Sequence, residues 1–507
     1  MGFDLYLVGF RLFDGTVILF MVLGVLLGII VGALPGLTAT MGVSILVPLT
    51  YNLSPTAALM MLLGIYCAAN YAGSISATLV NIPGTPSAVM TTLDAYPMAQ
   101  KGQAGRAIGL ATLSSALGGL FSVFTLALFS PMIASIALKF TSLEMFLVAL
   151  WGISIMAYVS PGSTLKGLIS GIFGLLIATV GFDPLTAAPR FTFGSVYLSA
   201  GVQFIAVMIG LFGVSEILLN IEKNPATAKQ EIFRVENSFE SLKEMKGLWG
   251  TILRSSIVGV IIGAIPGAGG TIASIVAYAQ QKRFSRHPEE LGKGSPEGIA
   301  AAESANNACT GGAMTTLLSL GIPGDAVTAI LIGAFVLHGL QPGPFLFEKH
   351  FDLVSAIFIG MVFINILFFL FGMFGAKYFA RLLFIPRPAL NTGILSLCVI
   401  GTYAVQSSMF DVGVMLFFGV LGYLMNKQEI PRAPLVLGLI LGPLMEENFR
   451  RWIGLAHGKY LAVLWDTYTK NPVSVLLTIL VILTFLLPAF QKQKRVTEDA
   501  SKYTKEK

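Results

Sequence analysis

The feature of this sequence that most constrains its fold is a long uncharged apolar stretch, residues 15–93, that two Pro-Gly pairs interrupt. The first interruption is GALPG at residues 32–36, and the second is NIPGTP at residues 81–86. Proline removes a backbone donor and glycine loosens a helix, so each interruption frees backbone N–H and C=O groups within apolar sequence. A bilayer tolerates such groups only where protein or a water-filled cavity satisfies them. The pattern predicts discontinuous membrane helices whose ends face a polar site.

The composition indicates a membrane protein. Apolar residues make up 55% of the 507 residues, and only 11% are charged. Apolar windows of about 20 residues, enough to cross a bilayer, recur along nearly the whole chain. We predict an all-α polytopic membrane protein of about 10–12 transmembrane helices, some of them broken or re-entrant. The apolar run that begins at Thr16 exceeds the core of a signal peptide, so we expect it to be an uncleaved first helix.

The second half of the chain repeats both interruptions. GAIPGAGGT at residues 263–271 matches GALPGLTAT at residues 32–40, and GIPGD at residues 321–325 matches NIPGT at residues 81–85. Between these motifs, residues 305–312 correspond to the region from Asn70 to Ser76. Three matches in the same order indicate an internal duplication, which is the repeat architecture of secondary transporters.

Loop charges predict that the two repeats are inverted. In the first repeat the loop after the first break is uncharged, whereas the loop after the second, which we expect at residues 94–106, carries Lys101 and Arg106. In the second repeat the order is reversed, because residues 282–293 carry the basic side chains and residues 337–349 are nearly neutral. Basic loops collect on the cytoplasmic side. Equivalent loops therefore lie on opposite sides of the membrane.

We accordingly predict four segments. Residues 1–220 form the first repeat, with broken helices at 32–36 and 81–86, and residues 249–490 form the second, with broken helices at 263–270 and 321–325. Both repeats include simpler scaffold spans, which we place at residues 107–138, 145–165 and 191–215 in the first. The charged cytoplasmic linker between them, residues 221–248, has the apolar spacing of a surface helix, and residues 491–507 form a basic cytoplasmic tail.

The breaks can form a site for an anion. A helix N-terminus presents unpaired N–H groups and about half a positive charge, so two broken helices that meet can bind an anion without arginine. The alternative is structural, because Ser and Thr also bond to their own helix and Gly permits close helix packing. The predicted substrate-binding residues are Pro35, Gly36, Thr38, Thr40, Ser74, Ser76, Asn81, Pro83, Gly84, Thr85, Ser87, Gly267, Gly269, Gly270, Thr271, Thr310, Gly324 and Thr328.

The same breaks can hold a coupling cation. Freed carbonyl groups are hard oxygen ligands that suit sodium, and Asn70, Asn306 and Asn307 can add side-chain oxygens. Asp325 is an acid within apolar sequence, so it is a functional candidate, but it can equally cap the following helix. For Glu303, nearer a polar loop, a structural role is favoured. We predict cation binding by Asn70, Asn306, Asn307 and Asp325, without a transition metal.

The sequence disfavours an enzyme. Its four histidines are scattered, it has no nucleophile motif, and its three cysteines lie in apolar sequence without CxxC spacing, as expected of core thiols. Two rivals to a carrier are weaker. A channel would use the broken helices as a filter, and an intramembrane enzyme would need converging catalytic groups.

The motifs together resemble one family, the large membrane subunit of the tripartite tricarboxylate transporters. The resemblance rests on residues 32–37, 70–86, 100–107, 263–270 and 321–324 and covers nearly the whole chain. It implies a bacterial inner-membrane permease that works with a small membrane subunit and a periplasmic substrate-binding protein. It also implies import of citrate or another carboxylate, driven by a cation gradient, typically sodium, with no other cofactor.

We therefore expect a binding-protein-dependent secondary transporter with elevator-like alternating access. The alternatives are an anion channel-like pore or a proton-coupled carrier that works without a binding protein. The sequence does not identify the carboxylate, because specificity is expected to reside largely in the partner that captures it.

Overall fold

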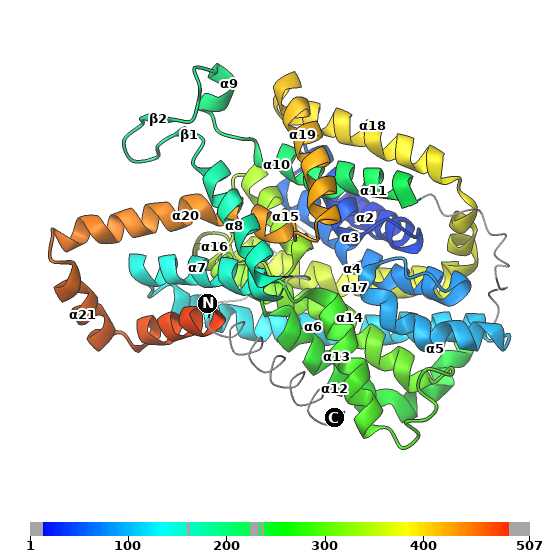
Figure 1. Cartoon of the computed structure of the whole chain (residues 1–507). Coiled ribbons are helices and arrows are strands. Elements are labelled where there is room, and N and C mark those ends of the chain that lie inside the picture. The colour runs from blue at the N-terminus through cyan, green and yellow to red at the C-terminus, as the bar shows by residue number, and fades with distance from the viewer. Residues whose placement is uncertain (1–13, 160–162, 224–232, 234, 236–237, 486–507) are drawn as a thin grey trace, which may run out of the picture. The chain divides into compact units, whose positions relative to one another are not determined.

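A computed structural model describes residues 14–159, 163–223, 233, 235 and 238–485 (Figure 1). These residues are almost entirely helical, and their one sheet is a two-stranded antiparallel ribbon. Eight described helices are long and apolar enough to cross a membrane, and a bent pair, Tyr460–Thr469 with Pro472–Phe485, passes the same test together. Three shorter apolar helices accompany them. The prediction of an all-α polytopic membrane protein is confirmed.

The first repeat opens with two parallel helices that are joined by a returning segment. α2 (Gly15–Ala33) and α4 (Pro55–Val80) run parallel, because Gly24, Gly28 and Gly32 lie in turn against Met61, Ile65 and Ala69. The chain between them, α3 (Ala39–Leu46) and the short 3₁₀ helix η1 (Pro48–Thr50), must therefore return to the end from which α2 started. The first break is thus the tip of a re-entrant hairpin. After α4, the turn η2 (Pro86–Ala88) leads into α5 (Val89–Gln100).

The second repeat has the same construction. α12 (Met245–Gly263) runs parallel to α14 (Pro296–Leu320), with Gly259 against Ala305 and Gly263 against Cys309. α13 (Gly269–Phe284) makes the return between them, and α15 (Ala326–Leu337) follows the second break. Adding a Cβ at Gly263 would strike the backbone of Cys309, so this close parallel packing depends on glycine.

The two repeats are inverted relative to each other. The Asn306 amide donates to the Asn70 carbonyl (3.0 Å) and the Asn307 amide to the Cys67 carbonyl (3.1 Å). Higher residue numbers in α4 therefore face lower numbers in α14, so these two central helices are antiparallel. Since each is parallel to the first helix of its own repeat, the bundles enter the membrane from opposite ends, as the loop charges predicted.

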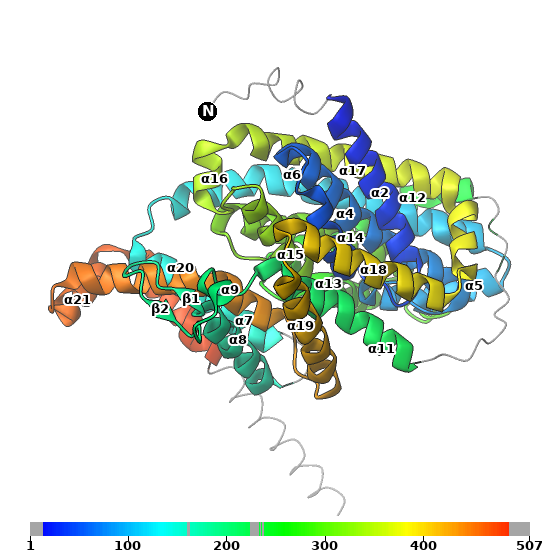
Figure 2. The ribbon, with the colours of Figure 1, turned by 90° about the horizontal axis from the view of Figure 1, so that it is seen from above.

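The chain divides into two compact units, and the re-entrant helices of both repeats lie in unit 1. Unit 1 is built within residues 1–138 and 203–424, and in it the long helix α6 (Ala104–Ala137) packs along α14 while α17 (Phe351–Phe379) packs along α4 (Figures 1 and 2). Its other elements are α10 (Phe204–Met208), the π-helix η3 (Ile209–Val214), α11 (Ser215–Lys223), η4 (Ser238–Glu244), α16 (Pro344–Lys349), η5 (Ala380–Phe384), α18 (Arg387–Gln406) and most of α19 (Met409–Lys427).

Unit 2 is built within residues 139–202 and 425–507. Its elements are α7 (Ser142–Val159), α8 (Thr164–Ala178), β1 (Gly181–Phe182), β2 (Pro189–Arg190), α9 (Val196–Ser199), α20 (Ala433–Ala456) and α21 (Tyr460–Lys470). Each unit combines helices from the first and the second half of the chain. α20 packs on α8 of the first half, and η3 packs on α19 of the second, where Gly419 meets Val214. Each unit therefore contains parts of both predicted repeats.

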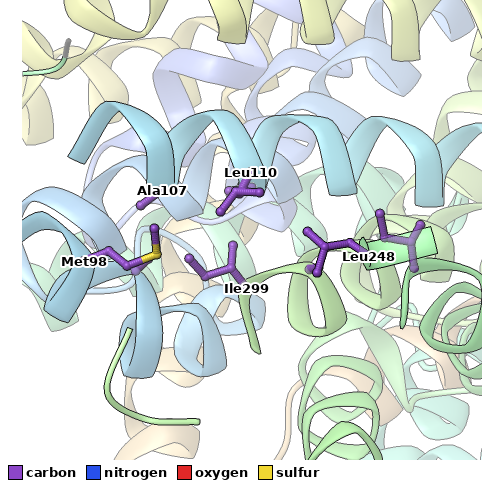
Figure 3. Close-up of a cluster of buried hydrophobic side chains, with 9 residues drawn as sticks. Met98, Ala107, Leu110, Leu248 and Ile299 are labelled. Atoms are coloured by element: carbon purple, nitrogen blue, oxygen red, sulfur yellow. The ribbon is translucent and has the colours of Figure 1, made fainter. Parts of the chain in front are cut away.

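A cluster of apolar side chains joins the repeats at one end of unit 1 (Figure 3). Met98 of α5, Leu110 of α6, Leu248 of α12 and Ile299 of α14 belong to it, and all are nearly or fully buried. Beside it, Asp94 of α5 accepts hydrogen bonds from the N–H groups of residues 292, 294 and 295 and from the Tyr278 hydroxyl. One carboxylate thus ties α5 to the start of α14 and to α13.

Four sequence predictions of local structure were wrong. The span expected at residues 145–165 is two helices, α7 and α8. Residues 191–203, expected to be helical, are mostly irregular, because Gly194 and Gly201 have positive φ. Residues 94–100, expected in a loop, continue α5, since the carboxylate of Asp94 has partners within the protein. Residues 224–232, 234, 236 and 237 of the predicted linker lie outside the described residues, as does the tail, and the helical residues in the described part of the linker belong to α11, η4 and α12 instead of one surface helix.

An ion cluster holds the base of the β1–β2 hairpin in unit 2. The Asp183 carboxylate accepts from Arg450 of α20 (2.6 Å) and from the N–H groups of Leu185 and Thr186. Arg190 and Arg450 both pair with Glu446 (2.6 and 3.0 Å). The hydrogen bond from Arg450, followed by that from the Thr186 N–H, holds the pKa of Asp183 well below its usual range.

This cluster predicts a dependence of stability on pH. The folded pKa of Asp183 lies below the unfolded value of about 3.9, so the carboxylate stabilises the fold above that value and loses its contribution as the pH falls through the folded pKa. We expect acidification from pH 6 to 3 to lower the melting temperature less in D183N than in the wild type. The E289Q variant, changed at an exposed side chain, should keep the wild-type dependence. An unchanged dependence in D183N would contradict the role of Asp183.

Candidate functional site

The first re-entrant tip is built by the two breaks of the first repeat packing on each other. Asn81 ends α4 in the left-handed conformation (φ 55°). The chain then folds back, so that the Gly84 N–H donates to the Gly73 carbonyl (3.2 Å). Gly84 lies directly against the Gly32 carbonyl, and the Thr85 and Ser87 hydroxyls are 3.1 Å apart and buried. Ser76 lies beside Gly84 as well.

The second tip repeats this packing with different side chains. Gly324 lies against the Gly263 carbonyl and against Ala313, and its own carbonyl accepts from the Gly267 N–H (2.8 Å). The contacts of Gly84 with Gly32 and Gly73 thus have counterparts in those of Gly324 with Gly263 and Ala313. This register makes Asp325 the counterpart of Thr85. The two tips have the same backbone but opposite character, one neutral and one with a carboxylate.

The same register corrects one pairing from the sequence. Asn70 corresponds to Thr310 rather than to the asparagines of α14, and Asn306 corresponds to Tyr66. The motifs of α4 and α14 overlap in the structure, but the structural register differs from the alignment made on sequence alone. Their asparagines therefore stand at different positions. Asn70, Asn306, Asn307 and Thr310 nevertheless come together where α4 crosses α14, and the Cys67 thiol lies 3.9 Å from the Thr310 hydroxyl.

Asp325 caps a helix. Its Oδ1 accepts from the Thr328 N–H (2.8 Å), and the Thr328 hydroxyl completes a capping box at the start of α15. Its Oδ2 accepts from the Tyr66 hydroxyl of α4 (2.5 Å). The capping alternative is therefore realised. Tyr66 links the second tip to the first repeat, and the sequence analysis missed it because a tyrosine within an apolar run carries no distinguishing signal.

Asn306 and Asn307 have unpartnered oxygens. Both side chains are fully buried, and their amide groups donate to carbonyls of α4, which fixes which end of each amide is the oxygen. The Oδ1 atoms of both have no hydrogen-bond partner. The Asn306 Oδ1 lies next to Gly270, and the Ser87 Cβ lies next to the same glycine. A buried acceptor without a donor is costly, so this position suits a ligand that offers a donor or a positive charge.

Helix starts from opposite repeats meet around this crossing. η2, which leads into α5, packs on α13, and α15 packs on α3. The N–H groups at a helix start are free to bind an anion. The first tip therefore combines acceptor oxygens with nearby helix starts. Glu303 of α14 is buried close by, where Thr91 and Ser115 donate to its two oxygens.

Other predicted residues have local roles or lie apart. Thr38 caps α3 by accepting from the Met41 N–H (3.1 Å), the Gly36 carbonyl accepts from Asn220 of α11, and Asn81 is exposed. The Ser74 hydroxyl is buried without a partner. The partly buried residues at the breaks are Pro35, Gly36, Thr40, Pro83, Gly267, Gly269, Gly270 and Thr271. The cysteines at 67, 309 and 398 are free and buried. Within the described residues, no cluster of His, Cys, Asp or Glu could hold a metal ion.

The tip packing predicts that Gly84 tolerates no side chain. A Cβ there would strike the Gly32 carbonyl and approach Ser76, so G84A should open the tip and destabilise the fold by about 1–3 kcal/mol, the cost of overpacking. A fall in melting temperature would test this in detergent. The control is G250A, because a Cβ at Gly250 of α12 meets nothing within 4 Å. Equal melting temperatures for G84A and G250A would contradict the packing.

An inverted pair of re-entrant hairpins around a central polar crossing defines a polytopic membrane transport protein. Residues 18–437 match the model of the tripartite tricarboxylate transporter TctA family, and the chain belongs to that family.

Two relatives come from Agrobacterium vitis. An uncharacterized 52.8 kDa protein in the TAR-I ttuC' 3' region is 37% identical over 477 residues, which cover 94% of each chain. An uncharacterized protein in the TAR-II ttuC' 3' region is 33% identical over 239 residues, covering 46% of this chain and 97% of the relative. No solved structure matches the chain significantly.

Proposed function

We propose that this chain is the large permease subunit of a secondary transporter that imports a small carboxylate, a tricarboxylate or a similar anion, together with sodium. The observation that carries the proposal is the pair of buried, unpartnered Oδ1 atoms of Asn306 and Asn307 at the crossing of the inverted repeats. Family membership supports a permease that works with a small membrane subunit and a periplasmic substrate-binding protein in the bacterial inner membrane.

The side chains present fit a sodium ion. Sodium prefers neutral or charged hard oxygens, and amide oxygens and freed carbonyls supply them in transporters. In this proposal the Asn306 and Asn307 oxygens hold the cation, whose charge offsets that of the substrate. Asn70 contributes through its backbone carbonyl, which fixes the Asn306 amide. Asp325 is committed to its cap and to Tyr66, so it acts on the tip rather than as the main ligand.

The carboxylate is assigned to the neutral first tip. The Thr85 and Ser87 hydroxyls can donate to it, and the start of α5 supplies N–H groups. The second tip is less suitable, because Asp325 would repel an anion. Substrate and cation would thus bind side by side, each lowering the cost of bringing the other into the membrane.

Uptake into proteoliposomes tests the function. Labelled citrate and other carboxylates are offered with an imposed sodium gradient, with and without the small subunit and the binding protein. We expect saturable accumulation that needs the binding protein and stops without the sodium gradient. Gradient-independent leak of many anions would overturn the carrier and indicate a channel, and accumulation driven by a proton gradient alone would overturn sodium coupling.

Alternating access is assigned to movement of the re-entrant bundle, α2–α5 with α12–α15, against the simpler helices. The exposed tip residue Asn81 gives a test through N81C and a membrane-impermeant thiol reagent. The label should react from one side at a time, and saturating substrate and sodium should change the side. Reaction from both sides at once would indicate an open pore instead.

A further inference from the structure

The β1–β2 hairpin of unit 2, with the segment that follows it, exposes an unusual set of apolar side chains. Phe193 is 87% exposed and Val196 is 84% exposed. Their exposed apolar neighbours are Phe182, Leu185, Phe191 and Tyr197. Phe191 and Phe193 also hold positive φ angles (52° and 47°), which bulky residues rarely adopt. A cluster of this kind marks a surface that contacts something other than water.

The hairpin continues an apolar face of α8. The glycine face of this helix packs on its neighbours, with Gly167 against Ala157 of α7 and Gly174 against Leu435 of α20. The opposite face carries exposed apolar residues at helical spacing, namely Leu165, Ile169, Ile172 and Leu176. In a polytopic membrane protein such a face is in contact with lipid. The hairpin follows directly on the end of α8 (Figure 1).

The length of α8 sets the depth of the hairpin. Its 15 residues span about 22 Å at 1.5 Å per residue, less than the roughly 30 Å hydrocarbon core of a bilayer. A helix of this length cannot reach both boundaries of the hydrocarbon core, and the hairpin begins only three residues after α8 ends at Ala178. The hairpin is thus held close to the apolar layer that α8 occupies. Aromatic side chains are favoured at that boundary.

The backbone of the hairpin is largely satisfied from within, as a position near the bilayer demands. β1 pairs with β2 in register, Gly181 with Arg190. Across the turn, the Asp183 N–H donates to the Ala188 carbonyl (2.9 Å), and the Asp183 carboxylate accepts from the N–H groups of Leu185 and Thr186. The ion cluster of Asp183, Arg190, Glu446 and Arg450 then fixes the hairpin to α20.

We propose that the hairpin and residues 191–197 form a rigid interfacial anchor that inserts Phe193 and its apolar neighbours into the headgroup and upper acyl region of the lipid bilayer. The occupant is lipid rather than a partner protein, because the hairpin follows directly on α8, whose exposed face is apolar over its whole length. The anchor belongs to unit 2 and fixes the depth of α8 and α20 in the membrane.

Site-directed spin labelling in nanodiscs tests the anchor, with the label at F193C. The native cysteines are buried, and the unsubstituted protein gives the background signal. I172C on the exposed face of α8 is the lipid control, and E289C, at an exposed side chain of the α13–α14 loop, is the water control. We expect the ratio of oxygen to nickel-complex accessibility at F193C to match I172C and to exceed that at E289C several-fold.

Two results would overturn the anchor. A ratio at F193C equal to that at E289C would place Phe193 in water. Protection from both oxygen and the nickel complex would show that protein covers it. L185C in the hairpin turn offers a second label position, because Leu185 does not share the positive φ of Phe193. The measurement needs no transport activity, so its outcome is independent of the proposed function.

Discussion

Replacing Asp94 with alanine should cause the largest loss of stability of any single substitution considered for this protein. The Asp94 carboxylate is fully buried and accepts from three N–H groups, of Gly292, Gly294 and Ser295, at 2.8–2.9 Å, and from the Tyr278 hydroxyl at 2.7 Å. A hydrogen bond to a charged group contributes about 1.5–3 kcal/mol. Losing the acceptor of four such bonds should cost at least about 3 kcal/mol.

The backbone around Asp94 explains why the loss is not easily repaired. Gly292 and Gly294 both have positive φ (89° and 104°), so their N–H groups converge on one point, and only the carboxylate fills it. The same group joins α5 of the first repeat to the start of α14 in the second. D94A should therefore loosen the contact between repeats that Met98 and Ile299 make beside it.

Melting temperatures in detergent measure this effect. D94N should lose less than D94A, because an amide oxygen can still accept from the N–H groups. E289A is the matched control, since Glu289 lies in the same loop but is exposed and pairs only with His287 among the contacts described. It should stay within about 0.5 kcal/mol of the wild type. If D94A and E289A unfold at the same temperature, the carboxylate does not join the repeats.

The breaks and the duplication could be predicted from sequence because they depend on local chemistry. Proline and glycine interrupt a helix through their own backbone geometry, whatever packs around them, and the structure places GALPG and GAIPG at equivalent hairpin tips. The inversion could be predicted for a similar reason, since basic side chains report which side each loop occupies. These features need only neighbouring residues to be recognised.

The partners of single polar side chains could not be predicted. Asp94 stands in a sequence that resembles an ordinary polar loop, and its acceptor role appears only when residues 292–295 fold against it. Tyr66 and Asp325 are similarly remote in the chain. The offset between the repeats was also hidden, because Asn306 aligns with a tyrosine rather than with Asn70. Such pairings depend on how helices cross, which local spacing does not encode.

Replacing Asn306 with alanine should have the largest effect on transport under the proposed function. The substitution removes a fully buried oxygen beside the first tip, where Gly270 and Ser87 adjoin it. Loss of even an outer-shell partner of a metal ligand typically lowers metal affinity by about 10–100-fold, and Asn306 is proposed as a direct ligand. In sodium-dependent uptake by the complete transporter, N306A should raise the sodium concentration for half-maximal rate by about 10-fold or more. The protein should still fold, because the substitution removes only the hydrogen bonds of one side chain, to the Asn70 carbonyl and to Glu303, each of which contributes about 1 kcal/mol.

The matched control is N365A. Asn365 of α17 is also buried, its amide donates to the Met361 carbonyl (2.7 Å), and its Oδ1 likewise has no partner. It faces Gly119 of α6. If the unpartnered oxygen of Asn306 binds the coupling cation, the two variants can lose similar stability, but only N306A changes the sodium dependence. Equal sodium dependence in both would instead assign Asn306 to helix packing and leave the cation to other oxygens at the crossing.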